Sequence, residues 1–182
     1  MNKIQYHSFF ICYLLVSLSN IGYGQSRDDI IKNIKDSFQQ INSDRTLKTI
    51  KLENEQFLEN MTDGGGSLTG YFKNDTINKI KVWIGLSYGI KQYEYYFKNG
   101  QLFFVYEKDE NFSHNDNNGS FDYTKLNFAF EGRYYINNGQ MIDVKTKGQK
   151  PFEKKSNNQF IKEFIADSKL YTRLLQSHLK NK

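Results

Sequence analysis

The sequence has very few of the residues on which covalent cross-links and nucleophilic chemistry depend. It contains one cysteine (Cys12), one proline (Pro151) and three histidines in 182 residues. A single cysteine excludes an intrachain disulfide, so the fold must be stabilised by its core alone. Cys12 also lies in an amino-terminal apolar run. If that leader is removed, no cysteine remains to act as a metal ligand or a thiol nucleophile.

The first 24 residues have the layout of a secretory signal peptide. Lys3 precedes an apolar run at residues 9–18, and the small residues of "SNIGYG" follow it, which suits cleavage before Gln25. The apolar run is about half of the ~20 residues that a membrane-spanning helix needs. We therefore predict export to the periplasm or the extracellular space, with no stable membrane anchor after cleavage.

Charge of either sign is not gathered into long blocks. The chain has a formal net charge of +5, and removal of Lys3 with the leader lowers it by one, to +4. Interspersed charges are typical of a solvated surface rather than of a track for nucleic acid. We therefore expect no nucleic-acid partner.

Two segments, at the two ends of the mature chain, are expected to be amphipathic helices. The first runs from Ser26, which can cap it, to about Asn42, and the second runs from Asn158 to Leu179. The apolar residues that recur at helical spacing are Ile30, Ile31, Ile34, Phe38 and Ile41 in the first, and Phe160, Ile161, Phe164, Ile165, Tyr171, Leu174, Leu175 and Leu179 in the second.

The sequence between these helices is typical of β-strands, beginning with a strand expected within residues 46–54. It is rich in Tyr, Phe, Ile and Val and is broken by turn sequences such as "DGGG", "KND", "KNG", "HNDNNGS" and "NNG". Successive strands joined by short turns form an antiparallel meander. We predict a single α+β domain over residues 25–182. It would be a curved antiparallel β-meander of about six to eight strands, flanked by an N-terminal and a C-terminal helix.

Aromatic residues are abundant and gather around Asn-Gly pairs. The stretch "YEYYFKNGQLFFVYE" (93–107) places seven of them around Asn99-Gly100, a pair that favours a two-residue hairpin turn. A regular hairpin pairs residues whose numbers sum to 199. Phe97–Leu102, Tyr95–Phe104 and Tyr93–Tyr106 would then share one ring-rich face, which we expect to pack on the two helices.

The hairpin pattern recurs. "YYFKNGQLF" (95–103) aligns with "YYINNGQMI" (134–142), and "YFKNDTI" (71–77) aligns with "YFKNGQL" (96–102). The shifts of 39 and 25 residues are unequal, which argues against a solenoid of fixed period and favours hairpins of one sheet. In the first copy Asp75 replaces glycine, so a longer loop is expected there.

The same register, carried across the repeat, collects polar and aromatic residues on one face of the sheet. This candidate binding face consists of Glu94, Tyr96, Glu107, Glu131, Arg133 and Tyr135. The alternative is an ordinary solvated sheet face, on which a Glu–Arg pair contributes little.

The strings "EYYFKNGQLFFVYEKDE" and "FEGRYYINNGQMID" resemble a group of uncharacterised exported proteins of Gram-negative bacteria. In that group a Tyr-Tyr-Phe-x-Asn-Gly-x-Leu hairpin precedes an Arg-Tyr-Tyr-Phe-x-Asn-Gly-x-Leu-Ile hairpin. The match covers about Gly65 to Asp143, and Ile136 stands where the group usually has Phe. The resemblance implies an exported β-rich domain and no known chemistry. The Tyr-x-x-x-Gly-x-Leu rhythm is also similar to MORN-like repeats, some of which occur in antitoxin or immunity proteins.

The sequence contains no recognisable catalytic motif around its histidines. His114 lies in a polar loop and His178 in the last helix, and neither has a nucleophile motif nearby. A calcium loop at "HNDNNG" would put His114 and Lys125 where oxygen ligands are needed, so we expect no metal site and no cofactor.

The sequence thus favours an exported, non-enzymatic binding module, for which a protein partner is one candidate. One alternative is an inhibitor or immunity-type protein that blocks a secreted toxin or hydrolase. Another is an enzyme that uses Glu94 and Glu107 as paired carboxylates.

Overall fold

The computed structural model describes residues 26–116, 119–150 and 156–180. The predicted signal peptide lies outside these ranges. In chain order the elements are α1 (Arg27–Ser43), β1 (Lys48–Glu53), a short 3-10 helix (Asn54–Gln56), β2 (Gly66–Lys73), β3 (Thr76–Leu86), β4 (Gly89–Lys98), β5 (Gln101–Asn115), β6 (Ser120–Asn137), β7 (Gln140–Gly148) and α2 (Asn157–Lys180).

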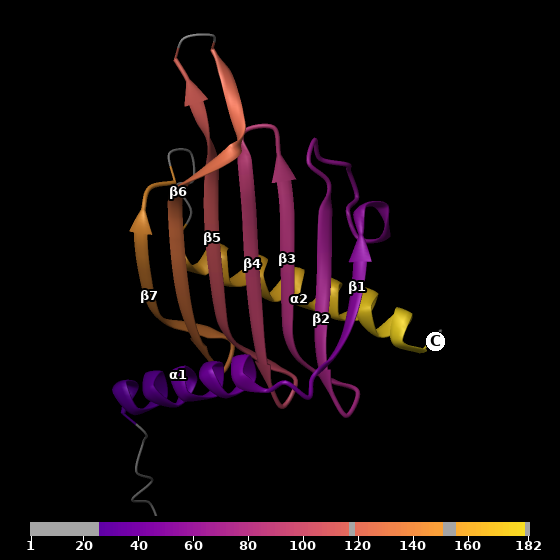
Figure 1. The fold of residues 1–182 in the computed structure, drawn as a ribbon. Coiled ribbons are helices and arrows are strands. Elements are labelled where there is room, and N and C mark those ends of the chain that lie inside the picture. The colour runs from indigo at the N-terminus through magenta and orange to yellow at the C-terminus, as the bar shows by residue number, and fades with distance from the viewer. Residues whose placement is uncertain (1–25, 117–118, 151–155, 181–182) are drawn as a thin grey trace, which may run out of the picture.

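Seven strands of the described chain form one antiparallel sheet. Their order in the sheet is their order in the sequence, β1 to β7. Figure 1 shows α2 crossing the sheet behind the strands, and α1 lying across the end where the β4–β5 and β6–β7 turns are. The predicted α+β meander with one helix before it and one after it is therefore confirmed.

Both helices begin and end close to the expected residues. The Ser26 side chain caps α1, because its Oγ accepts a hydrogen bond from the Asp29 N–H at 3.1 Å. After α1, Asp44 accepts hydrogen bonds from the Thr46 N–H at 2.9 Å and from Lys73 Nζ at 2.8 Å. The hydrogen bonds from Lys73 and Thr46 hold the pKa of the Asp44 carboxyl well below its usual range. This local network ties the end of α1 to β2.

Three hairpins share one turn geometry. In the β2–β3, β4–β5 and β6–β7 connections both turn residues have positive φ: Asn74 (47°) and Asp75 (62°), Asn99 (50°) and Gly100 (74°), and Asn138 (49°) and Gly139 (74°). These are two-residue type I′ turns. The longer loop expected at Asp75 is wrong, because asparagine and aspartate tolerate the left-handed region better than most residues do.

Each of these hairpins also carries a β-bulge after the second residue pair from the turn. In β4–β5, Phe97 pairs with Leu102 as predicted, but the next pair is Tyr96 with Phe104. Phe103 is therefore an extra residue, and Asn78 and Ile142 occupy the same place in the other two hairpins. A bulge of this kind sets two residues of one strand against one of its partner.

The bulge changes the register of everything beyond it. Tyr95 lies opposite Val105, and Tyr93 lies opposite Glu107. The predicted pairs Tyr95–Phe104 and Tyr93–Tyr106 are therefore wrong.

The aromatic residues are divided between two cores, one on each face of the sheet. On the α2 side, Tyr95 and Tyr134 surround Phe164, with ring centroids 6.3 and 4.8 Å away. On the α1 side, Tyr96 and Phe104 surround Phe38, at 4.9 and 5.2 Å. The expectation that one ring-rich face packs on both helices is wrong, because each helix covers a face of its own.

One glycine explains how α2 fits closely over β2. Gly70 stands in the repeat where Tyr95 and Tyr134 stand in the other two hairpins. A Cβ at Gly70 would lie 2.8 Å from a methyl group of Leu175, which is fully buried. The missing side chain makes the room that Leu175 occupies.

Candidate functional site

The structure brings together five of the six residues of the predicted binding face. Glu94, Tyr96, Glu131, Arg133 and Tyr135 are on the α1 side of the sheet. Glu107 is on the opposite side, where it contacts Tyr134 of the α2-side core. The separation follows from the bulge at Phe103, which turns Tyr106 rather than Glu107 toward α1.

A hollow of about 420 Å³, the α1 pocket, lies between α1 and this face. Lys35 and Phe38 line it from the helix, and Glu94, Tyr106 and Arg133 line it from the strands. It combines aromatic walls with charges of both signs.

Two of the charged side chains that line the α1 pocket, Glu94 and Arg133, already have ion-pair partners on the sheet. Glu94 accepts a hydrogen bond from Tyr96 Oη at 2.6 Å and pairs with Lys79 Nζ at 3.1 Å. Burial lowers the pKa of Lys79, and the Glu94 carboxylate acts in the opposite direction. Glu94 therefore serves mainly to satisfy two neighbours.

Glu131 has a similar arrangement. It accepts a hydrogen bond from Tyr106 Oη at 3.1 Å and pairs with Arg133 at 2.9 Å. Burial and the Glu131 carboxylate raise the pKa of Tyr106 to about 12. A ligand would have to displace these internal pairs, so the alternative of a structural, solvated face gains weight.

Two rings of the predicted face belong to the α1-side core. Tyr96 is 0% exposed and Tyr135 is 4% exposed, so neither is the half-exposed contact ring that a binding face needs. The Tyr96 ring packs under α1, while its hydroxyl group reaches Glu94 and Asn42.

Glu107 is fully buried beneath the other face. Its carboxylate accepts a hydrogen bond from Tyr134 Oη at 2.8 Å and forms an ion pair with Lys150 Nζ. The Lys150 ammonium also lies over the rings of Phe130 and Phe160, 4.8 and 5.5 Å from their centroids. Glu94 and Glu107 thus lie on opposite faces, and they do not form the carboxylate pair that the enzyme alternative requires.

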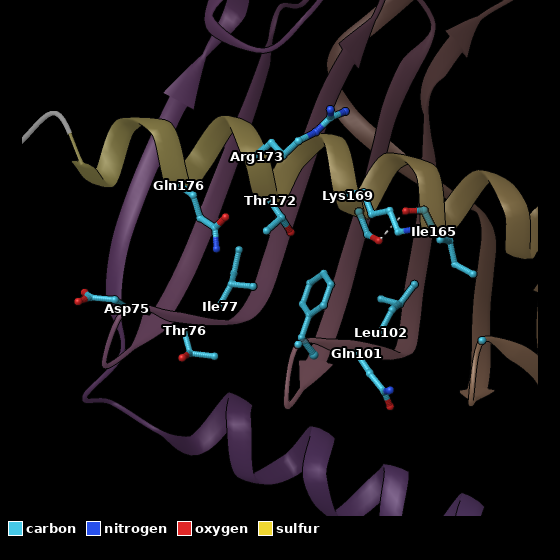
Figure 2. A pocket seen from close by; sticks show the side chains of 14 residues that line it. Asp75, Thr76, Ile77, Gln101, Leu102, Ile165, Lys169, Thr172, Arg173 and Gln176 are labelled. Atoms are coloured by element: carbon cyan, nitrogen blue, oxygen red, sulfur yellow. Dashed lines mark hydrogen bonds between the residues drawn. The ribbon is translucent and has the colours of Figure 1, made fainter.

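A larger hollow of about 840 Å³ lies between α2 and the hairpin turns. We call it the α2 groove, and Figure 2 shows it with α2 above and the strand ends below. Four of the side chains that line it are apolar and form its floor: Ile77, Phe97, Leu102 and Ile165. Ile77 and Phe97 are each 5% exposed, so the floor is continuous with the α2-side core.

Polar residues surround this apolar floor. Thr172 and Gln176 point from α2 toward the strands (Figure 2), and Gln101 stands at the turn of β4–β5. Lys169 and Arg173 lie one helical turn apart on α2 and line the same groove. Within the described part of the chain, no ion pair involves either cation.

Sequence reasoning did not find the α2 groove, although one feature pointed to it. The apolar stripe of α2 is interrupted between Ile165 and Tyr171, where helical spacing calls for an apolar residue at position 168. Ser168 is 3% exposed there and donates a hydrogen bond to the Ile165 carbonyl at 3.0 Å. Its small side chain leaves space between the helix and the turns.

His114 and His178 each lie near the carboxyl end of their element. His114 pairs with Asp116 at 3.0 Å near the end of β5, and His178 contacts the Leu174 carbonyl. Neither histidine lines the α1 pocket or the α2 groove. Over residues 26–116, 119–150 and 156–180, no cluster of His, Asp or Glu is placed to hold a metal ion. None of the described helices is long and apolar enough to cross a membrane.

Comparisons with protein-family models, with curated proteins and with solved structures give no match to this chain. The resemblance to exported hairpin proteins therefore stays a prediction, and the function has to be argued from the two hollows.

Proposed function

We propose that this protein is an exported, non-enzymatic binding module whose α2 groove receives a ligand. The observation that carries the proposal is the apolar floor of the groove, which is continuous with the α2-side core and bordered by polar side chains. Ligand sites typically combine a largely apolar wall with a small number of polar groups that orient the ligand. The α2 groove has an apolar floor of this kind, whereas in the α1 pocket Glu94 and Arg133 are already paired with neighbours on the sheet.

The position of the groove supports binding without loss of stability. Its floor consists of side chains that the core already holds in place, such as Phe97 and Ile77. Its border consists of turn residues and of α2 side chains such as Thr172 and Gln176. A ligand could therefore enter without breaking a hydrogen bond of the sheet.

The proposal is tested by filling the groove. Thr172→Trp places a large ring where Thr172 points at the strands, and Ala166→Trp places the same ring on an exposed position of the same helix outside the groove. Each protein is incubated with a metabolite extract and examined by native mass spectrometry. We expect the wild type and Ala166→Trp to retain a small molecule that Thr172→Trp does not. Equal retention by all three would show that the groove is not the site.

A second candidate, an inhibitor of a secreted toxin or hydrolase, is favoured by the arm at the end of β5–β6. Here β5 and β6 run beyond their last pairs with β4 and β7, at Asn111 and Phe130 (Figure 1). Aromatic residues that are exposed on this arm are Phe121 (36%), Tyr123 (64%) and Phe128 (46%). Exposed aromatic residues dominate the binding energy of many protein interfaces.

The arm can be tested separately from the groove. Phe121→Ser combined with Tyr123→Ser removes two exposed rings, and we expect no large change in the melting temperature. If the arm acts as an inhibitor, this variant should lose inhibition of a target hydrolase that the wild type inhibits, whereas Thr172→Trp should retain it. Undiminished inhibition by the arm variant would exclude this role for the arm.

A further inference from the structure

The α2 groove runs along α2 and across the strands (Figure 2). Along the helix it extends from Ile165 to Gln176, eleven residue steps, or about 16 Å at the rise of an α-helix. Across the sheet it extends from Thr76 in β3 to Gly139 beside β6, three strand spacings, or about 14 Å. The two lengths agree, and each is long enough to hold an extended chain of about a dozen carbon atoms.

The α2 groove has more cations than carboxylates, and the two kinds of charge lie on different elements. The cations Lys169 and Arg173 are on α2, and the carboxylate of Asp75 is on the β2–β3 turn near Gln176 (Figure 2). Figure 2 also shows Arg173 extended away from the floor. Among the described residues neither cation has an ion-pair partner, so a charged ligand group at the mouth could meet them while remaining in contact with water. A charge at the mouth avoids the large desolvation penalty that it would suffer on the floor.

We propose that the α2 groove binds a linear amphipathic molecule, an apolar chain with a single anionic head group at Lys169 and Arg173. This inference rests on the proposed function and adds the chemical class of the ligand. The chain lies against Phe97, Leu102 and Ile165, and the head group accepts hydrogen bonds from the two cations, which are stronger than hydrogen bonds between neutral groups.

The test compares probes that share one chain and differ in the head group. Laurate carries a carboxylate, dodecanol is neutral and dodecyltrimethylammonium is cationic. Each is titrated into the purified protein below its micelle concentration, and binding is measured by calorimetry and by amide chemical shifts. We expect laurate to bind about tenfold more tightly than dodecanol, as one added charge-assisted contact allows.

Variants then locate the effect. Lys169→Gln combined with Arg173→Gln should remove the preference for laurate and leave dodecanol binding unchanged. Lys48→Gln combined with Lys162→Gln removes the same charge from exposed positions outside the groove and should leave the preference intact.

The outcomes separate this inference from the proposed function. If laurate and dodecanol bound equally tightly and Thr172→Trp blocked both, the preference for an anionic head group would be overturned. The groove would still be supported as the binding site. Tightest binding of dodecyltrimethylammonium would overturn it in favour of a contact with Asp75. If the alkyl probes bound the Thr172→Trp variant as tightly as the wild type, both proposals would be overturned. No binding of any chain would overturn the ligand class, and the metabolite experiment would still decide the proposed function.

Discussion

Tyr95 and Tyr96 are neighbours in the chain, and their rings lie in two separate cores on opposite faces of the sheet. Tyr95 contacts Tyr171 of α2, with centroids 5.9 Å apart, and Tyr96 contacts Phe38 of α1 at 4.9 Å. Tyr134 and Tyr135 divide in the same way. Each Tyr-Tyr pair thus attaches both helices to one strand, because successive side chains of a strand point to opposite faces.

The two-core arrangement predicts which mutations are independent. Tyr95→Leu and Phe104→Leu should each lower the free energy of unfolding by about 1–3 kcal/mol, since both truncate buried rings. Because the two residues lie in different cores, the double mutant should equal the sum of the single mutants within about 0.5 kcal/mol. Tyr96→Leu with Phe104→Leu should depart from additivity, since these rings are 5.7 Å apart. Urea denaturation of the five variants and the wild type measures both cycles. A strong coupling energy between Tyr95 and Phe104 would contradict the bulge and support the regular hairpin register.

The turns predict a purely conformational loss of stability. Gly100 and Gly139 have φ of 74°, and no atom lies within 4 Å of a Cβ built on either. Gly100→Ala and Gly139→Ala should therefore each destabilise by about 1 kcal/mol through the left-handed backbone alone. Lys98→Ala, beside the first turn and exposed, is the control and should change little. A neutral Gly100→Ala would contradict the type I′ turn.

The ion pair between Glu107 and Lys150 predicts that replacing Lys150 alone costs more stability than replacing both partners. Lys150→Met leaves the fully buried Glu107 carboxylate without its cation, and a loss of about 3–5 kcal/mol is expected. Glu107→Gln added to Lys150→Met removes the uncompensated charge, and we expect it to recover much of that loss. Chemical denaturation of the two single variants and the double variant decides the matter. If Lys150→Met were as stable as the wild type, the pair would have no structural role.

The buried phenols predict a loss of stability in alkali. Tyrosines whose pKa is raised by burial are Tyr71, Tyr93, Tyr95, Tyr96, Tyr106, Tyr135 and Tyr171. In the unfolded chain these phenols have a pKa near the ordinary tyrosine value of 10.0, so the unfolded state releases protons first. Stability is complete below pH 10 and falls as pH rises toward the folded values, with about 1.4 kcal/mol per pH unit for each phenol that is still protonated in the fold.

Tyr171 isolates one such contribution. Burial raises the pKa of Tyr171 to about 12, and Tyr171→Phe should reduce the slope of stability against pH between about pH 10 and pH 12 by up to one phenol's share. Tyr88→Phe, at an exposed tyrosine, should leave the slope unchanged. Denaturation midpoints at a series of pH values give the slopes. An unchanged slope in Tyr171→Phe would contradict the assignment.

The α1 pocket predicts a contrast between two neighbouring residues. Arg133→Ala removes an exposed partner of Glu131 and should change stability by about 0–1 kcal/mol. Tyr135→Ala removes a buried ring and should cost about 3–5 kcal/mol. Thermal denaturation of both variants tests the contrast. If Tyr135→Ala had no greater effect than Arg133→Ala, the ring would belong to the surface after all.

Much of the fold could be predicted because its causes are local. The stripe of α1 and the Asn99-Gly100 turn each depend on a few consecutive residues, and both were correctly read. The bulge at Phe103 could not be predicted in this way, since nothing in "GQLFFV" separates a bulged residue from a paired one. That single residue moved Glu107 to the other face and divided the predicted site. The α2 groove was missed for a different reason. It depends on how a helix and three distant turns approach one another, and only the gap at Ser168 marks it in the sequence.

The order of the strands has a consequence for how the molecule assembles. Every strand pairs only with its neighbours along the chain, so the sheet can form by successive local steps, which are kinetically fast. The core on the α2 side is different, because Phe164 and Leu175 come from the last element. A chain that emerges amino terminus first therefore completes its sheet before it can cover that face. Until α2 docks, the nascent molecule presents Tyr95, Val105 and their neighbours to solvent, and this interval is when it is most open to aggregation and most in need of a chaperone.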